Sequence, residues 1–154
     1  MTFPIVADFI EEERGEMSPS YNHSYLSYRI AKTIDIDDRF NIHIELTIEI
    51  DGNDYVPDIA VYKQRDVDFL HDTIKMREMP ILVIEILSPT QSMRDVIEKI
   101  AVYLQSGVKS CWLVLPEVKT ITVFHDIRRP ISYSRGNLVD DELGLNFPVE
   151  EVFQ

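Results

Sequence analysis

The chain has 154 residues, of which 45% are hydrophobic and 27% are charged, and its formal net charge at pH 7 is −12. This length suits one domain over residues 1–154, and the hydrophobic fraction is too high for a disordered chain. The negative charge disfavours a protein that simply coats nucleic acid, because phosphate binding depends mainly on Lys and Arg. No hydrophobic run is long enough to span a membrane, so we expect a cytoplasmic protein without a membrane partner.

Hydrophobic periodicity predicts a helix and a hairpin in the first third of the chain. After a charged turn at 11–16, hydrophobic residues recur at helical spacing over 21–34, which predicts an amphipathic helix. Over 41–50 Ile and Leu alternate with polar residues, which is typical of a strand with one solvated face. A turn signal at 51–54 leads to a second strand over 55–62, and we expect the two strands to pair as a hairpin.

The middle of the chain predicts a central strand followed by a helix. Residues 66–76 fit either a short helix or a loop. Residues 80–87 are apolar on both faces, which favours a buried strand that is covered by helices. Ser92 begins a Ser-x-x-Asp capping box for a helix over 93–106, and Gly107 suits the C-terminal end of that helix.

The remaining elements define the fold class. Two further strands are expected at 111–115 and 120–125, whereas residues 127–154 are expected to be peripheral and to end in a short turn over 149–153. An early antiparallel hairpin with a later crossover helix indicates a mixed β-sheet flanked by helices, rather than a doubly wound parallel sheet. We therefore predict an α/β (α+β) fold in which helices flank a mixed β-sheet.

Glu85 is the most informative residue for function. On its strand face it stands among Ile81, Val83 and Leu87, where an uncompensated carboxylate would be costly. Either the strand emerges at the edge of the sheet, or Glu85 pairs with a buried Lys or Arg, or the carboxylate binds a metal ion. Composition and spacing leave these explanations open.

Asp58 offers a second carboxylate for such a metal ion. A Pro-Asp pair is common at turns and strand starts, so Asp58 by itself indicates little. Its strand, however, comes directly before the strand that carries Glu85. The two carboxylates can therefore meet at one end of the sheet, where their oxygens would suit a hard cation.

Lys99 is the basic residue closest to this pattern. Helical geometry places it about 120° from the centre of the apolar stripe of its helix, with Tyr103 on the same side. Lys99 then flanks the buried face, although it also fits a solvated lysine paired with Asp95. The predicted stripe consists of Val96, Ile97, Ile100, Ala101 and Leu104.

These residues lie in a pattern that resembles a known family. The resemblance is strongest in Val83-Ile84-Glu85-Ile86-Leu87-Ser88-Pro89 and continues through Val56-Pro57-Asp58-Ile59-Ala60. Nearly the whole chain is similar to the Uma-two family of putative restriction endonucleases, in the PD-(D/E)xK nuclease superfamily. The other matching positions are Met17-Ser18-Pro19, His23, Lys99, Tyr103, Gly107-Val108 and Trp112-Leu113-Val114.

The resemblance implies a restriction-endonuclease-like core and assigns roles within it. Asp58 and Glu85 would be metal ligands with the carbonyl of Ile86, Lys99 would lie beside them, and the metal would be Mg²⁺ or Mn²⁺. The superfamily places its lysine two residues after the acidic residue, where this chain has Leu87. The resemblance therefore implies a lysine that has moved to the following helix. His23 and Tyr103 would be accessory residues, but His23 also fits a residue that only caps or packs its helix.

The leading hypothesis is a metal-dependent DNA endonuclease. In this chemistry the ion polarises the phosphate and lowers the pKa of bound water, while the lysine orients the water or stabilises the developing charge. The alternative is a nuclease-fold protein that no longer cleaves and serves as a binding or oligomerisation module, because a fold does not fix an activity. Many nucleases cut both strands as symmetric pairs, so a homodimer is also expected.

Overall fold

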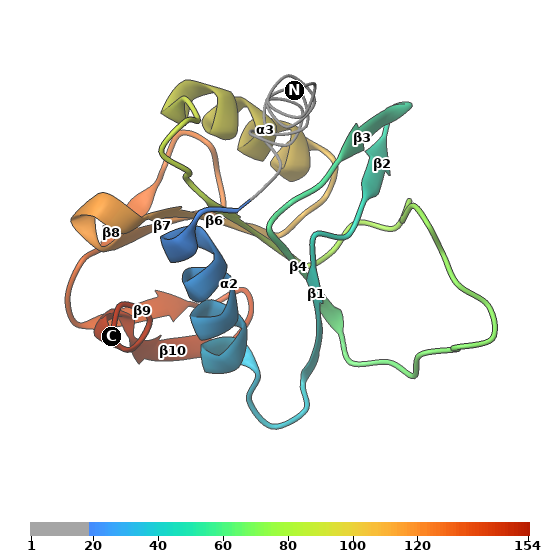
Figure 1. Ribbon diagram of the computed structural model, residues 1–154, viewed down its shortest axis with the longest axis horizontal. Coiled ribbons are helices and arrows are strands. Elements are labelled where there is room, and N and C mark those ends of the chain that lie inside the picture. Colours follow the sequence, from blue (N-terminus) through green and yellow to red (C-terminus); the bar gives the residue numbers. More distant parts are fainter. Residues whose placement is uncertain (1–18) are drawn as a thin grey trace, which may run out of the picture.

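A six-stranded sheet with one helix on each face organises the molecule (Figure 1). The computed structural model describes residues 19–154, so the charged turn at 11–16 and Met17-Ser18 lie outside the described residues. The helices are α2 (Tyr21–Ile34) and α3 (Met93–Gln105), with short 3-10 helices η1 (Pro116–Val118) and η2 (Val149–Glu151). The strands are β1 (Phe40–Ile44), β2 (Ile48–Ile50), β3 (Asn53–Tyr55), β4 (Ile59–Lys63), β5 (Leu82–Ile86), β6 (Ser110–Leu115), β7 (Thr120–Phe124), β8 (Ile131–Tyr133), β9 (Asn137–Asp140) and β10 (Leu145–Pro148).

The sheet is mixed, as predicted. Its strand order is β1-β4-β5-β6-β7-β8, and β2–β3 and β9–β10 form separate two-stranded sheets. Within the large sheet β5 and β6 run parallel and the other neighbours run antiparallel. Helix α3 lies between β5 and β6 in the chain and so provides the crossover that a parallel pair requires. This order places β4 and β5 in the interior of the sheet.

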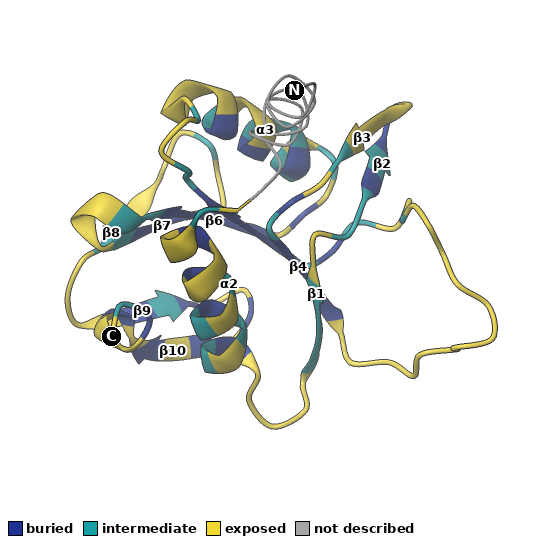
Figure 2. Cartoon of the chain, in the orientation of Figure 1, coloured by how far each residue is buried: buried dark blue, intermediate teal, exposed yellow. Residues whose placement is uncertain are grey.

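Each face of the sheet has its own hydrophobic core. On one face α2 buries Leu26, Ile30 and Ile34 against the sheet together with residues of β9 and β10. On the other face α3 and β2 pack against alternate residues of the same strands. Figure 2 shows the buried sides of both helices turned toward the sheet. The central strands are therefore covered on both faces, which explains why 80–87 is apolar throughout.

The helix ends agree closely with the sequence signals. Ser20 accepts a hydrogen bond from the His23 N–H at the start of α2, and Ser92 accepts one from the Asp95 N–H at the start of α3. Gly107 follows α3 with a φ of 108°, a conformation that costs little only for glycine. No helix among residues 19–154 is long and apolar enough to cross a membrane.

Two predicted strands are in fact interrupted. The strand expected over 41–50 divides into β1 and β2, because Glu45 has a φ of 53° and the chain leaves the large sheet there. The strand expected over 55–62 divides into β3 and β4 around Pro57-Asp58. The hairpin turn at Asp51-Gly52 has positive φ at both residues, which suits a tight two-residue turn. Alternation persists across each interruption, so periodicity alone does not reveal it.

The prediction that residues 127–154 are peripheral was wrong. Leu138, Leu145, Phe147 and Val149 are buried in the core on the α2 face of the sheet. The short length of β9 and β10 hid their alternation from the sequence argument. The ambiguous segment 66–76 contains neither a helix nor a strand.

The buried stripe of α3 also differs from the prediction. Val96, Ile100 and Tyr103 are its buried residues, whereas Ile97 and Leu104 are only half-buried. The stripe is therefore rotated toward Tyr103, which was expected to flank it. The rotation allows the Tyr103 hydroxyl to reach Glu85, a buried polar partner that a hydrophobicity pattern does not register.

Candidate metal centre

Asp58 and Glu85 lie opposite each other at one end of two neighbouring strands. The antiparallel register of β4 and β5 pairs Ile59 with Ile84, so continuing it by one residue sets Asp58 opposite Glu85. Residues opposite each other in an antiparallel pair extend their side chains to the same face. The structure thus brings together the two carboxylates that the sequence singled out.

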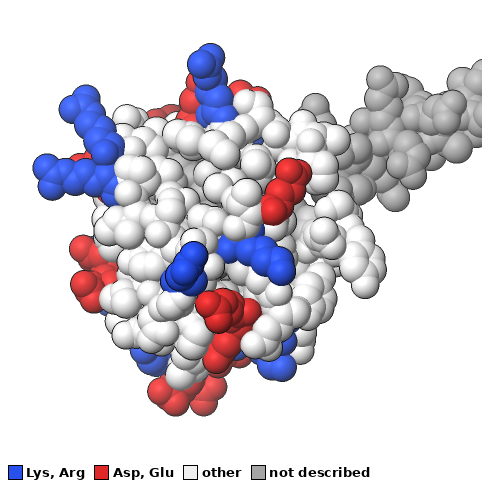
Figure 3. All heavy atoms as spheres, turned by 90° about the vertical axis from the view of Figure 1, so that its left-hand side faces the viewer, with Lys and Arg blue, Asp and Glu red and all other residues white. Residues whose placement is uncertain are grey.

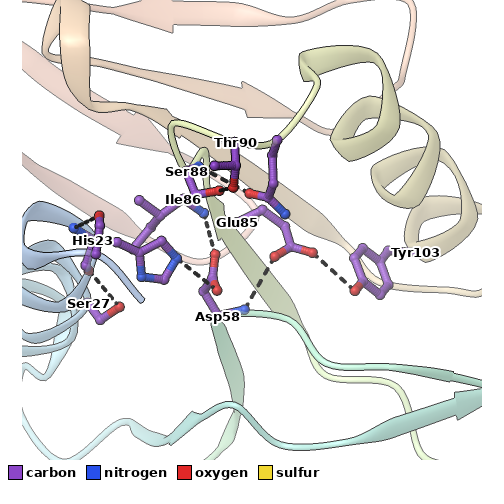
Figure 4. A network of polar contacts seen from close by, with 10 residues as sticks. His23, Ser27, Asp58, Glu85, Ile86, Ser88, Thr90 and Tyr103 are labelled. Carbon is purple, nitrogen blue, oxygen red and sulfur yellow. Dashed lines mark hydrogen bonds and ion pairs between the residues drawn. The ribbon is translucent and has the colours of Figure 1, made fainter. Parts of the chain in front are cut away.

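Two hydrogen bonds link these residues across the strands (Figure 4). The Asp58 N–H donates to Glu85 Oε1 at 3.3 Å, and the Ile86 N–H donates to Asp58 Oδ2 at 2.6 Å. Each carboxylate is therefore held by the backbone of the other strand. Ile86 contributes its N–H to this arrangement, while the role of its carbonyl as a metal ligand stays a prediction.

Glu85 is a buried carboxylate without a cationic partner. It is 6% exposed, and Tyr103 donates a hydrogen bond to its Oε2 at 3.2 Å. The pKa of Glu85 is raised to about 8, mainly by burial and then by the charge of Asp58, while the charge of Lys99 opposes the rise. No Lys, Arg or His in residues 19–154 forms an ion pair with Glu85, and its strand is central in the sheet. The described structure therefore contradicts an edge strand and a buried Lys or Arg partner for Glu85, while metal binding stays a prediction.

His23 contacts Asp58 directly. Its ring lies at the start of α2, is 8% exposed, and places Nε2 3.0 Å from Asp58 Oδ1. The hydrogen bond to Asp58 raises the pKa of His23 above its usual value, although burial acts against this rise. The backbone of His23 is also capped by Ser20. His23 therefore packs its helix and, in addition, fixes the orientation of the Asp58 carboxylate.

Lys99 lies nearby but touches neither carboxylate. It is exposed on α3 and lines a cleft of about 770 Å³ that Asp58 and Glu85 also line. Its charge lowers the pKa of Glu85, so the two groups interact electrostatically. Within the part of the chain that is described, Lys99 forms no ion pair with Asp58, Glu85 or Asp95. The lysine is consequently free to turn toward a bound anion.

Glu45 is a cleft residue that the sequence argument missed. Its N–H donates to the Asp58 carbonyl at 3.2 Å, which extends the β1–β4 register by one residue beyond Ile44 and Ile59. Glu45, Asp58 and Glu85 thus stand in a row across three adjacent strands, and all of them line the cleft. The sequence pattern places Glu45 on the solvated face of an unbroken strand. Only the strand register, which sets Glu45 directly opposite Asp58, identifies it as a residue of the cleft.

Comparison with known proteins assigns the family. The model of the family Uma2, described as putative restriction endonuclease, matches residues 6–150. The chain belongs to the Uma2 family. Its fold is similar to that of a putative nuclease of the family DUF820 from Anabaena variabilis, with a TM-score of 0.74 and 21% sequence identity over 88% of this chain and 82% of that chain. No curated protein matches the Uma2 chain.

The candidate ligands in this Uma2 chain suit a hard cation whose coordination shell the protein supplies only in part. No group of three or more His, Cys, Asp or Glu side chains among residues 19–154 is arranged to hold a metal ion. A carboxylate oxygen has about two acceptor sites, so the four oxygens of Asp58 and Glu85 retain capacity beyond their present hydrogen bonds. Mg²⁺ is commonly bound by one or two carboxylates, with waters and substrate phosphates completing its shell. Two facing carboxylates at an open cleft match that pattern.

Proposed function

We propose that this Uma2 protein is a nuclease that hydrolyses phosphodiester bonds in DNA with Mg²⁺ or Mn²⁺ bound at Asp58 and Glu85. The proposal places one such site in one domain over residues 1–154. The observation that carries it is the buried carboxyl of Glu85, which is 6% exposed, has no ion-pair partner among residues 19–154 and faces a second carboxyl group. Two adjacent carboxylates repel each other in a low-dielectric site unless a proton or a cation intervenes. A divalent cation removes this repulsion and gives the arrangement a function.

The surrounding residues fix the geometry of the two ligands. The His23 ring holds Asp58 from the α2 side, and the Tyr103 hydroxyl holds Glu85 from the α3 side. Partners of this kind orient metal ligands, and their loss commonly lowers metal affinity by about 10–100-fold. His23 and Tyr103 are therefore proposed as positioning residues rather than ligands.

Lys99 is proposed to act on the phosphate. A bound divalent cation would polarise the phosphate and lower the pKa of a bound water. The ammonium group of Lys99 would orient that water or stabilise negative charge on the phosphate oxygens. Its exposed position at the cleft, without an ion-pair partner in the described chain, supports this role.

The charge of the cleft makes DNA binding depend on the metal. Its titratable lining consists of one lysine, Lys99, one tyrosine, and five carboxylates: Glu45, Asp58, Glu85, Asp95 and Glu98. On the face shown in Figure 3, Lys and Arg side chains stand among Asp and Glu side chains and form no continuous basic patch there. We therefore expect DNA to bind weakly without divalent cations and more tightly once they reduce the charge of the cleft.

A cleavage assay tests the proposed function. Supercoiled plasmid and labelled single- and double-stranded oligonucleotides are incubated with the protein and with Mg²⁺, Mn²⁺ or EDTA. We expect metal-dependent cleavage that Asp58→Asn and Glu85→Gln abolish together with metal binding. Lys99→Met should abolish cleavage but retain most of the metal affinity. Arg94→Met, which removes an exposed charge from the same helix, is the matched control and should retain activity.

A second function is favoured by the acidic rim of the cleft. Glu45, Asp95 and Glu98 surround the cleft where a nuclease would be expected to offer basic groups to DNA. This Uma2 member would then be a nuclease-fold protein that binds or oligomerises without cleaving. Metal binding without cleavage of any DNA substrate, under conditions in which the protein is folded, would favour this alternative.

A further inference from the structure

Residues 64–80, here called the arm, leave the body of the protein as a long exposed loop (Figures 1 and 2). Both ends of the arm are anchored. At its base Arg65 forms two hydrogen bonds of 2.8 Å with Glu78, and the Tyr62 hydroxyl donates to the Glu78 carbonyl. Met76 exchanges backbone hydrogen bonds with Thr47 and Glu49. These hydrogen bonds therefore hold the base of the arm in a defined position on the protein.

The tip of the arm, residues 66–74, exposes an unusual amount of apolar surface. Phe69 is 91% exposed, Leu70 89% and Ile74 83%. The hydrogen bonds of the tip stay within it: Asp68 accepts from the Leu70 N–H and contacts the ring of His71. Several large apolar side chains exposed on one short loop favour an interaction site, because water solvates them poorly.

The charge of the tip limits the partners it can accept. It contains Asp66, Asp68 and Asp72 and no Lys or Arg. Nucleic acid and anionic membrane surfaces would repel it. The favoured partner is an apolar protein surface that carries positive charge.

Helix α2 of the same chain offers such a surface. Tyr21, Tyr25, Tyr28 and Lys32 recur at helical spacing on one exposed side, here called the tyrosine face. Tyr21 is 89% exposed and Tyr28 59%, and Lys32 Nζ lies 5.9 Å from the centre of the Tyr28 ring. This side is aromatic and carries the positive charge of Lys32, whereas the tip of the arm is aliphatic, aromatic and acidic. The two surfaces are complementary in both hydrophobicity and charge.

The arm and the tyrosine face do not meet within one copy of the chain. No hydrogen bond or ion pair joins them in residues 19–154. In Figure 1 they lie on either side of β1, which is an edge strand of the large sheet. A two-fold axis that runs parallel to β1 but outside the chain can bring the arm of each copy over α2 of the other. Such an exchange is closed and self-complementary, as a symmetric dimer requires.

We propose that the chain forms a two-fold dimer in which the arm of each copy docks on the tyrosine face of its partner. The proposal rests on surfaces outside the candidate metal centre and does not depend on nuclease activity. Each dimer contains two identical contacts. Damage to the arm and damage to the tyrosine face should therefore weaken the same interaction.

Sedimentation velocity on the full chain, with paired variants, tests this proposal. The arm variant carries Phe69→Gln with Leu70→Gln, and the helix variant carries Tyr21→Gln with Tyr28→Gln. The control carries Val118→Gln with Ile131→Gln, which are 63% and 54% exposed outside both surfaces. The wild type and the control should be dimers, and the dissociation constant of each test variant should rise by at least about 100-fold.

Mixing the two test variants is the decisive step. A heterodimer of the arm variant and the helix variant retains one intact contact, because the intact arm meets the intact tyrosine face. The mixture should therefore contain more dimer than either variant alone at the same total concentration. A monomeric wild type, an arm variant that remains dimeric, or a mixture without added dimer would overturn the proposal. Far-ultraviolet circular dichroism of each variant verifies that it is folded.

Discussion

Two buried carboxylates in this molecule have opposite surroundings. Asp140 is 0% exposed, and three side chains satisfy it: the Ser110 hydroxyl, the Trp112 indole N–H at 2.8 Å and the His125 ring at 2.9 Å. Glu85 is 6% exposed and receives one backbone N–H and one tyrosine hydroxyl, while a second carboxylate lies opposite. The protein thus provides three side-chain partners for Asp140 but only one side-chain partner for Glu85.

The difference separates a structural carboxylate from a functional candidate. Asp140 belongs to β9 and its partners come from β6 and from the end of β7, so it attaches the C-terminal hairpin to the sheet. Burying a charge is tolerated when hydrogen bonds replace its hydration. Glu85, which lines the cleft, has only two hydrogen-bond donors and a second carboxyl group opposite. Perturbed groups of this kind concentrate at functional sites.

The largest expected effect on stability comes from Asp140. Asp140→Ala removes the shared partner of the buried Ser110 and Trp112 side chains and of the exposed His125 ring, so the free energy of unfolding should fall by about 3–5 kcal/mol. Urea denaturation monitored by tryptophan fluorescence measures it. Asp141→Ala, at the exposed neighbouring position, is the control. A loss below about 1 kcal/mol would mean that Asp140 does not attach the hairpin in the way described.

The effect of Glu85→Gln on the free energy of unfolding should have the opposite sign to that of Asp140→Ala, and it should depend on pH. The pKa of Glu85 is about 8 in the folded protein against an ordinary value of 4.5, so the stabilising contribution of its protonated form is complete below about pH 4.5 and is lost as the pH rises through 8. In EDTA, the stability of Glu85→Gln relative to the wild type should therefore increase by about 1–3 kcal/mol when the pH is raised from 5 to 9. The raised pKa of His23 is common to both proteins and cancels in the difference.

Urea denaturation at both pH values measures this gain. Glu142→Gln, at an exposed position, is the matched control and should show no comparable dependence on pH. If Glu85→Gln were less stable than the wild type at pH 9 in EDTA, the charge of Glu85 would already be well compensated by the protein. The contrast with Asp140 would then disappear.

A smaller effect is expected from Tyr103→Phe. This change removes the hydroxyl that donates to Glu85 Oε2 and keeps the buried ring, so stability should fall by about 1 kcal/mol. Metal affinity should fall by about 10-fold, because the glutamate loses an orienting partner. Tyr133→Phe, whose hydroxyl bonds the Val139 carbonyl, is the control and should leave metal affinity unchanged. Equal metal affinities for Tyr103→Phe and the wild type would remove Tyr103 from the site.

Much of this architecture could be predicted because it depends on local patterns. The caps at Ser20 and Ser92 and the apolar run over 80–87 are determined by neighbouring residues, and they gave the helices and the central strand. Asp58 and Glu85 could be paired because their strands are consecutive in the large sheet. The family resemblance supplied the roles that spacing alone left open.

The remainder depends on contacts between distant segments. The hydrogen bonds of Asp140 join residues 15 to 30 positions apart, and no local pattern marks it as buried. Glu45 reaches the cleft only because the chain turns out of the large sheet at that residue. The rotation of α3 toward Tyr103 likewise depends on a hydroxyl partner on another element. Such features require the tertiary structure.

Calorimetric titration of Mn²⁺ and Mg²⁺ into the full chain tests the central claim most directly, because it needs no knowledge of the substrate. The wild type should bind Mn²⁺ saturably, Asp58→Asn and Glu85→Gln should each lose this binding, and Asp95→Asn, at another carboxylate of the cleft, should retain it. Binding should be tighter at pH 9 than at pH 6, because the metal competes with the proton on Glu85. A folded wild type that binds neither cation, even with a DNA oligonucleotide present, would contradict the account.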